Sequence, residues 1–316
     1  MYVKRPCFLS ANMTAVALLI AMLCSIVHAQ VLVASEAAAA PSSTGRAWLT
    51  ESYLHVAIGE YEARFAKASA WTLAAVSYRG EELLNETGAY QSVLNVEVEK
   101  TGDERPDPWI GTGHGKEVVV SLSLEVDGEP YALSEHETGP WERSGRSFTL
   151  VKESDLGPYR HTARVELNEN GLSEDMHFEF QGPEMSINFM YVFMHCFGKQ
   201  LEQWYVERAD GQRQHGTFLS DNSFSLRRDI RWAAMYAPEL KMGVVYAYPE
   251  AYAGDPPDRN FFWNRPHHSK LYLRVMPPQG EGVSFSYRVR LSGFEASNDD
   301  WNAVAERLAA ELAEKK

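Results

Sequence analysis

The stretch Trp71–Glu97 reads WTLAAVSYRGEELLNETGAYQSVLNVE, and it indicates the fold class of this chain of 316 residues. A largely apolar run ends at the segment Tyr78-Arg79-Gly80-Glu81, and a second run follows it. Glycine in such a short segment between two runs is typical of a tight turn. The stretch therefore predicts a strand, a tight turn and a second strand.

Segments with a strand pattern continue along the chain. Lys116–Asp127 (KEVVVSLSLEVD) alternates apolar and polar residues and ends at Asp127-Gly128, which is a strong signal for a hairpin. Met185–Phe197 (MSINFMYVFMHCF) is apolar on both faces, which predicts a central strand covered on both sides. Further strands are expected at Ser147–Lys152, His161–Asn168, Met176–Gln181, Arg231–Tyr236, Met242–Tyr248, Lys270–Met276 and Val283–Ser292, with a turn at Glu169-Asn170-Gly171.

Only the C-terminal segment has helical spacing. Trp301, Val304, Leu308 and Leu312 recur on one face of a helix, and Asn298 or Asp299 can cap its start. This pattern predicts a helix over about residues 299–314. Many strands separated by turns, with one terminal helix, predict an all-β fold, namely a large antiparallel β-sandwich.

The N-terminus has the pattern of an export signal. Lys4 and Arg5 precede the apolar run Ala15–Val27, which is short for a membrane span, and small residues end at Ala29. We expect residues 1–29 to be a signal peptide cleaved after Ala29, which implies a secreted or periplasmic protein. Residues 30–45, rich in Ala and Ser, are expected to form a disordered leader.

The remaining residues, 46–316, suit a single β-sandwich domain that ends in the helix. Of the three cysteines, Cys7 and Cys24 would leave with the signal, so Cys196 would have no partner for an intramolecular disulfide. Cys196 lies in an apolar run, which predicts a buried core thiol rather than a nucleophile. A lipidated Cys24 is a weaker alternative, since Leu23 is a poor residue before such a cysteine.

The chain is acidic, with a net charge of −13. Loss of Lys4 and Arg5 with the signal would make the rest more acidic by two charges, because the signal contains no acidic residue. This balance argues against nucleic acid and against an anionic membrane surface as partners. The sequence contains no Walker-type loop, no dinucleotide fingerprint and no Cys/His metal spacing, so no cofactor is expected.

Three segments resemble galactose-mutarotase-like proteins: the "G-x-E-L" turn Gly80–Leu83, the core-strand pair Met194-His195 and the late strand Ser284–Ala296 (SFSYRVRLSGFEA). The resemblance implies a large β-sandwich (supersandwich) with a sugar cleft into which His195 points. In the aldose epimerases of this family an acidic residue acts as base. Here only Glu250 and Glu295 are candidates for that role.

A first candidate site is the glycine-rich segment Trp109–Lys116 (WIGTGHGK). Three glycines around Thr112 and His114 can bring backbone N–H groups and an imidazole close to a ligand. An ordinary connection with an exposed histidine is the alternative. Trp109 and Lys116 are further binding candidates, and His114 is a candidate for proton transfer.

His195 is a second candidate, for proton transfer to or from a sugar. A histidine in an apolar strand is more often a satisfied core residue, and the family resemblance brings the two interpretations to near parity.

The densest polar and aromatic segment is Asn260–Arg274 (NFFWNRPHHSKLYLR). Phe262 and Trp263 can stack on the apolar faces of sugar rings, and an arginine can bind a uronate carboxylate through two hydrogen bonds. The adjacent histidines do not form a metal pair, because neighbouring side chains on an extended chain point apart. The other candidates in this segment are Asn264, Arg265, His267, His268, Lys270 and Arg274 for binding, and Tyr272 for proton transfer.

A fourth segment, Arg208–Arg231, contains Arg213, His215 and Arg227, which would give a basic rim for an acidic glycan. A charged surface loop balanced by its own aspartates is the favoured alternative. Trp204, just upstream, is a candidate aromatic platform.

The resemblance to galactose-mutarotase-like proteins implies a carbohydrate-active protein, and similar sandwiches host polysaccharide lyases. Together with the candidate segments it favours an exported enzyme of the lyase type, which removes the proton α to a uronate carboxylate and expels the glycosidic oxygen. Arg265 or Lys270 would neutralise the carboxylate, and His195, His114 or Tyr272 would move the proton. The alternatives are an aldose mutarotase or epimerase, with Glu250 as its candidate base, and a non-catalytic glycan-binding module. The expected partner is a saccharide or polysaccharide, and the oligomeric state stays open.

Overall fold

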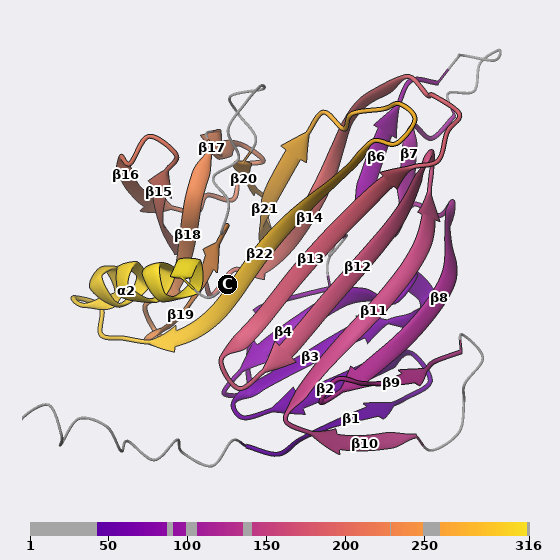
Figure 1. Ribbon diagram of the computed structural model, residues 1–316. Coiled ribbons are helices and arrows are strands. Elements are labelled where there is room, and N and C mark those ends of the chain that lie inside the picture. The colour runs from indigo at the N-terminus through magenta and orange to yellow at the C-terminus, as the bar shows by residue number, and fades with distance from the viewer. Residues whose placement is uncertain are drawn as a thin grey trace, which may run out of the picture. The chain divides into compact units, whose positions relative to one another are not determined.

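Two large antiparallel sheets make up most of the described chain (Figure 1). The computed structural model describes residues 43–86, 91–98, 106–134, 141–227, 229–248 and 260–314. The expected signal peptide, nearly all of the expected leader, and Glu250 lie outside these residues. Ser43–Lys316 form one unit by their contacts.

The first sheet has twelve strands in its described part and carries a ligand-sized cavity. Its main path runs in the order β10 (Glu142–Gly145), β1 (Gly45–Leu49), β2 (Tyr53–Ile58), β3 (Tyr61–Ala66), β4 (Thr72–Tyr78), β5 (Glu81–Leu84), β14 (Ile187–Gly198), β21 (His268–Val275), β20 (Asn260–Asn264) and β17 (Phe224–Arg227). The short strands β6 (Val93–Val96) and β7 (Trp109–Gly111) extend it beside β14.

The second sheet has ten strands in its described part and packs its apolar face against the first. Its order is β16 (Arg213–Thr217), β15 (Gln203–Arg208), β18 (Ile230–Ala237), β19 (Met242–Ala247), β22 (Ser284–Glu295), β13 (Gly171–Phe180), β12 (Tyr159–Asn168), β11 (Ser147–Leu156), β8 (Glu117–Val126) and β9 (Glu129–Ala132). One apolar cluster contains buried side chains from both sheets, so the all-β sandwich expected from the sequence is confirmed.

The tight turns lie where the sequence predicts them. Arg79 and Gly80 join β4 to β5 with φ angles of 54° and 84°, and Asp127 and Gly128 join β8 to β9 with 52° and 86°. Two consecutive positive φ values are the geometry that matches a two-residue turn to the right-handed twist of a hairpin. Asn168 at the end of β12 pairs with Gly171 at the start of β13, which confirms the predicted turn at Glu169-Asn170-Gly171.

β14 is a central strand as expected, with β21 on one side and β5 and β6 on the other. Its second half is buried, but Phe189 and Tyr191 in its first half are partly exposed. The predicted cover on both faces is therefore incomplete, because this part of the strand borders the cavity.

The C-terminal helix α2 (Trp301–Glu314) covers β18, β19 and β22 (Figure 1). The Trp301 ring stacks on Tyr236 with a centroid distance of 4.9 Å, and Leu312 is buried in the same small cluster. The prediction of Asn298 or Asp299 as the cap is wrong. Ser297 Oγ accepts the Asp300 backbone N–H, so Ser297 rather than either predicted residue supplies this side-chain acceptor just before the helix. Among the residues that the structure describes, no helix is long and apolar enough to cross a membrane.

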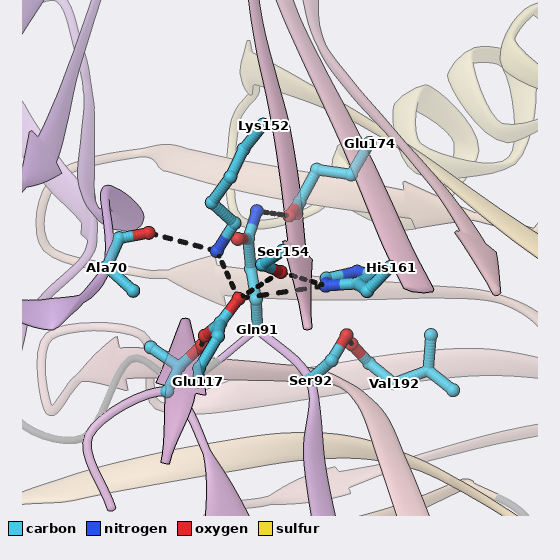
Figure 2. Close-up of polar contacts among 10 residues, drawn as sticks. Ala70, Gln91, Ser92, Glu117, Lys152, Ser154, His161, Glu174 and Val192 are labelled. Carbon is cyan, nitrogen blue, oxygen red and sulfur yellow. Dashed lines mark hydrogen bonds and ion pairs between the residues drawn. The ribbon is translucent and has the colours of Figure 1, made fainter. Parts of the chain in front are cut away.

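A buried charged cluster lies between the sheets. The Lys152 side chain is 1% exposed, and its Nζ lies 2.8 Å from Glu117 Oε1 and donates to the Ala70 carbonyl. Ser154 donates to the same carboxylate, and His161 Nδ1 lies 3.8 Å from it. Figure 2 shows Lys152, Ser154 and His161 gathered around Glu117.

The protonation of this cluster follows from its contacts. Burial alone would raise the pKa of Glu117, but the Lys152 ammonium, and after it the nearby His161, more than offset this effect and hold that pKa well below its ordinary value. Burial lowers the pKa of His161, against the smaller opposing effect of Glu117. The folded state thus holds Glu117 charged and opposes the charging of His161.

We predict that Lys152→Met lowers the free energy of unfolding by about 3–5 kcal/mol, because it leaves a buried carboxylate without its ammonium partner. Urea denaturation measures the change. Arg307→Met is the matched control, because this side chain is 67% exposed and its loss should change stability by less than about 0.5 kcal/mol. Equal stability of the Lys152→Met variant and the wild type would contradict a structural role for the pair.

We also predict that stability falls on acidification in two ranges. The lowered pKa of His161 means that the unfolded chain takes up its proton first, so stability declines as pH falls through the ordinary histidine value of 6.5. The lowered pKa of Glu117 means that its contribution is complete above 4.5 and is lost as pH falls below that value toward the folded pKa. Denaturation at a series of pH values measures this profile. In His161→Gln the decline between 6.5 and 4.5 should be shallower, and an unchanged slope would contradict the assignment.

Candidate functional site

A cavity of about 430 Å³ lies on the twelve-stranded sheet, on the face away from the ten-stranded sheet. Residues of β6, β7, β14, β17, β20 and β21, together with the glycine-rich loop after β7, line it. Its volume falls within the range of pockets that hold small ligands.

Strand β21 contributes a polar and aromatic row to this cavity. Lys270, Tyr272 and Arg274 line it, whereas Leu271 and Leu273 between them are buried in the main core. Successive side chains of a strand point to opposite faces, so the sequence KLYLR places its apolar residues inward and the other three toward the cavity. Three of the predicted site residues are therefore brought together by one strand.

Aromatic rings form the floor and walls of the cavity. The ring centroid of Tyr272 lies 4.6 Å from that of Phe261, on which it stacks, and 4.8 Å from that of Tyr191. Trp109 stacks on Tyr191 with a centroid distance of 5.8 Å. At the other end, Trp263 lies 6.1 Å from Tyr272. Trp109, Tyr191 and Trp263 are the partly exposed rings of this series, whereas Phe261 and Tyr272 are 8% and 2% exposed. The outer rings therefore offer most of the flat apolar surface, with few rotatable bonds to order.

The charged groups in the lining are basic. Arg227, Lys270 and Arg274 line the cavity, and among the described residues no aspartate or glutamate does. Lys270 is only 7% exposed, and burial lowers the pKa of its amine, with the nearby charge of Arg265 acting in the same direction. Burial also raises the pKa of the Tyr191 phenol, against the opposing charge of Arg274. The cavity is thus a basic, aromatic site in an acidic chain.

The glycine-rich loop places a histidine and a tryptophan on the cavity. Gly111 donates its N–H to the Gly115 carbonyl. Only glycine fits at position 111, because its φ angle is 132° and a Cβ there would lie 2.4 Å from the Ser92 carbonyl oxygen. Thr112 donates to Glu117 Oε2 at 2.8 Å, which anchors the loop to the buried cluster. The His114 ring stacks on Trp109 at 5.6 Å, and both line the cavity.

His195 lies on the other face of β14. Its neighbour Met194 lines the cavity, whereas His195 is 6% exposed and its Nε2 lies 2.5 Å from Glu174 Oε1 of the opposite sheet. Gln91 donates to the second oxygen of Glu174 (Figure 2), and the Tyr246 ring lies 4.9 Å from the His195 ring. The contacts of His195 thus join the two sheets, and the residue is not among those that line the cavity.

Several other predicted residues take structural positions. Trp204 is buried in the main core against Phe262, since β15 belongs to the second sheet. Phe262, which was expected to stack on a sugar ring, faces the core instead. Its neighbour Phe261 lines the cavity. Asn264 is buried and donates to the hydroxyls of Ser223 and Ser225, which holds the end of β20.

The turn before β21 lies outside the cavity lining. The Arg265 guanidinium lies 4.4 Å from the centre of the Trp263 ring, and His267 is exposed. Burial lowers the pKa of His268 to about 4, with Lys270 and Arg265 acting in the same direction. Lys270, which lines the cavity, and Arg265, which does not, thus both act on His268.

The remaining candidates are also placed outside the cavity lining. Lys116 is exposed and donates to the backbone carbonyls of Asp107 and Trp109, so it braces the loop. The carboxylate of Glu295 pairs with Arg79 at the end of β22 and is not among the residues that line the cavity. Glu250 lies outside the described residues. Within those residues, no group of three or more His, Cys, Asp or Glu side chains is arranged to hold a metal ion.

Sequence reasoning missed Tyr191 and Phe224, which line the cavity. Tyr191 lies next to a bulge in β14, where the pairing of β14 with β21 shifts register between Tyr191 and Phe193. Such a bulge changes which residues face outward and is not visible in the apolar pattern. Phe224 is exposed on edge strand β17, which the sequence pattern did not reveal.

Comparisons with known proteins give structural likenesses only. A scan of protein-family models found no match, and a search of curated proteins found no similar sequence. A galactose mutarotase-like protein from Lactobacillus casei ATCC 334 is similar in structure, with a TM-score of 0.43 and 12% identity over 77% of this chain and 100% of that chain.

Two further structures are similar at the same level. The alpha-N-acetylgalactosaminidase NagBb from Bifidobacterium bifidum has a TM-score of 0.45 and 10% identity, over 80% of this chain and 39% of that chain. The Slr1438 protein from Synechocystis sp. PCC 6803 has a TM-score of 0.44 and 11% identity, over 77% of this chain and 96% of that chain.

Proposed function

We propose that the cavity binds an acidic saccharide and that the chain is an exported carbohydrate-active protein of the polysaccharide lyase type. The observation that carries this proposal is the composition of the cavity, in which stacked rings are combined with Arg227, Lys270 and Arg274. The C–H faces of a pyranose pack on aromatic planes, and guanidinium groups bind carboxylates through two hydrogen bonds.

The register across three strands supports a reacting centre in the middle of the cavity. Arg227 of β17 pairs with Phe261 of β20, and Phe261 pairs with Tyr272 of β21. All three line the cavity. A uronate ring over the edges of the Tyr272 and Phe261 rings would have a cation on one side and a phenol below it.

This arrangement suits β-elimination. Removal of the proton α to the carboxylate leaves an electron pair that forms a carbon–carbon double bond, the glycosidic C–O bond breaks, and the departing oxygen takes up a proton. Arg227 would bind the carboxylate and stabilise the negative charge that develops on it. Tyr272 and His114, which both line the cavity, would accept and return the proton.

Export is part of the proposal and rests on the sequence pattern of residues 1–29, a basic start followed by a short apolar run and small residues. A non-catalytic glycan-binding module is the second candidate, because stacked rings and cations suffice for binding without proton transfer.

The test is the ultraviolet absorbance of the unsaturated uronate when the protein is incubated with a panel of uronate polysaccharides. We expect absorbance to rise with at least one of them, and Tyr272→Phe to lower the rate by roughly a hundredfold or more while binding remains, because the ring is kept and the hydroxyl is lost.

Tyr131→Phe is the matched control, since Tyr131 lies on β9 away from the cavity, and its rate should equal that of the wild type. A flat trace across the panel together with measurable binding would reject the lyase and favour the binding module. A flat trace without binding would reject both.

A further inference from the structure

The cations of β21 stand at the two ends of a row. Lys270 and Arg274 are four residues apart on the same face, and a strand rises roughly 3.3 Å per residue, so their Cα atoms are about 13 Å apart. Tyr272 lies midway between them, and all three line the cavity. The row is therefore longer than one pyranose ring.

An aromatic platform stands beside each member of this row. Trp263 is paired with Lys270 across the sheet, and Phe261 is paired with Tyr272. At the other end, Tyr191 is paired with Arg274 and carries the stacked ring of Trp109. Three platforms thus follow one another along β21, the first and last with a cation next to them.

The two end cations differ in their surroundings. Lys270 is nearly buried, opposite Cys196 of β14. The Arg274 guanidinium lies 5.8 Å from the centre of the Phe189 ring. The sheet fixes the separation of the two Cα atoms, so the two cations together favour acid groups on rings that are spaced to match it.

We propose that the cavity recognises an oligosaccharide rather than a single sugar, with uronate carboxylates on at least two separate rings, one bound by Lys270 and the other by Arg274. This inference rests on the proposed function. The chain would lie along β21 with its central ring on Tyr272, and Arg227 would face that ring from β17. A single uronate can occupy only one of the end positions at a time.

The experiment is calorimetric titration with the mono- and trisaccharides of galacturonate, mannuronate and guluronate, and with maltotriose as an uncharged trisaccharide. For at least one uronate we expect the trisaccharide to bind at least about tenfold more tightly than its monosaccharide, and maltotriose to bind weakly, because both end cations act on the trisaccharide together. The affinity of the trisaccharide should also fall more steeply with salt than that of the monosaccharide.

Variants assign the two ends. Lys270→Met and Arg274→Met should each lower trisaccharide affinity about tenfold, toward that of the monosaccharide, whereas Arg307→Met, which removes an exposed charge on α2, should leave it unchanged. Thermal unfolding checks that each variant is folded, and the salt dependence of the wild type gives a test that needs no variant.

The outcomes separate this inference from the proposed function. Equal affinity for the mono- and trisaccharide, or a trisaccharide affinity that neither variant changes, would overturn the two-ended recognition while leaving an acidic-saccharide site in place. Binding of none of the saccharides would reject the proposed function itself.

Discussion

The buried carboxylate of Glu117 is the contact on which both the sandwich and the cavity depend. It pairs with Lys152, accepts a hydrogen bond from Ser154 of the same strand, and accepts another from Thr112 in the glycine-rich loop. An ionised carboxylate between two sheets is costly unless all its oxygens are satisfied. The partners that remove this cost also hold the loop that carries His114, so the stability of the interior and the shape of the cavity wall depend on the same charge.

A second constraint is the alternation of side chains along the strands that the core and the cavity share. In β20, Phe262 packs in the core while Phe261 and Trp263 face the cavity, and in β14 the same division separates His195 from Met194. Neighbouring residues on one strand therefore have unlike functions, one in stability and the next in ligand contact. A strand that lines a cavity with one face needs apolar side chains on its other face, because these pack in the core and hold the strand in place. In β21 leucines therefore alternate with Lys270, Tyr272 and Arg274.

The charge of the whole chain and that of its cavity have opposite signs. The chain carries a net charge of −13, yet the described lining of the cavity contains three cations and no carboxylate. At physiological ionic strength the surface charges are screened within about 8 Å, so a ligand in the cavity responds mainly to the groups that line it. Net charge thus bears on non-specific partners such as nucleic acid, whereas selection of an acidic ligand is a local property of a few fixed side chains.

The all-β class, the turns at Arg79-Gly80 and Asp127-Gly128, the central place of β14 and the terminal helix can be predicted from the sequence, because they follow from local backbone preferences and apolar periodicity. Composition also indicates Trp109, His114 and the row from Lys270 to Arg274 as site candidates. That these residues meet in one cavity, that His195 turns inward to Glu174, and that Trp204 and Asn264 are structural emerges from the folded arrangement alone. The reason is physical: strand pairing joins segments more than 150 residues apart, such as Trp109 and Tyr272, and a bulge in β14 sets which side chains face outward.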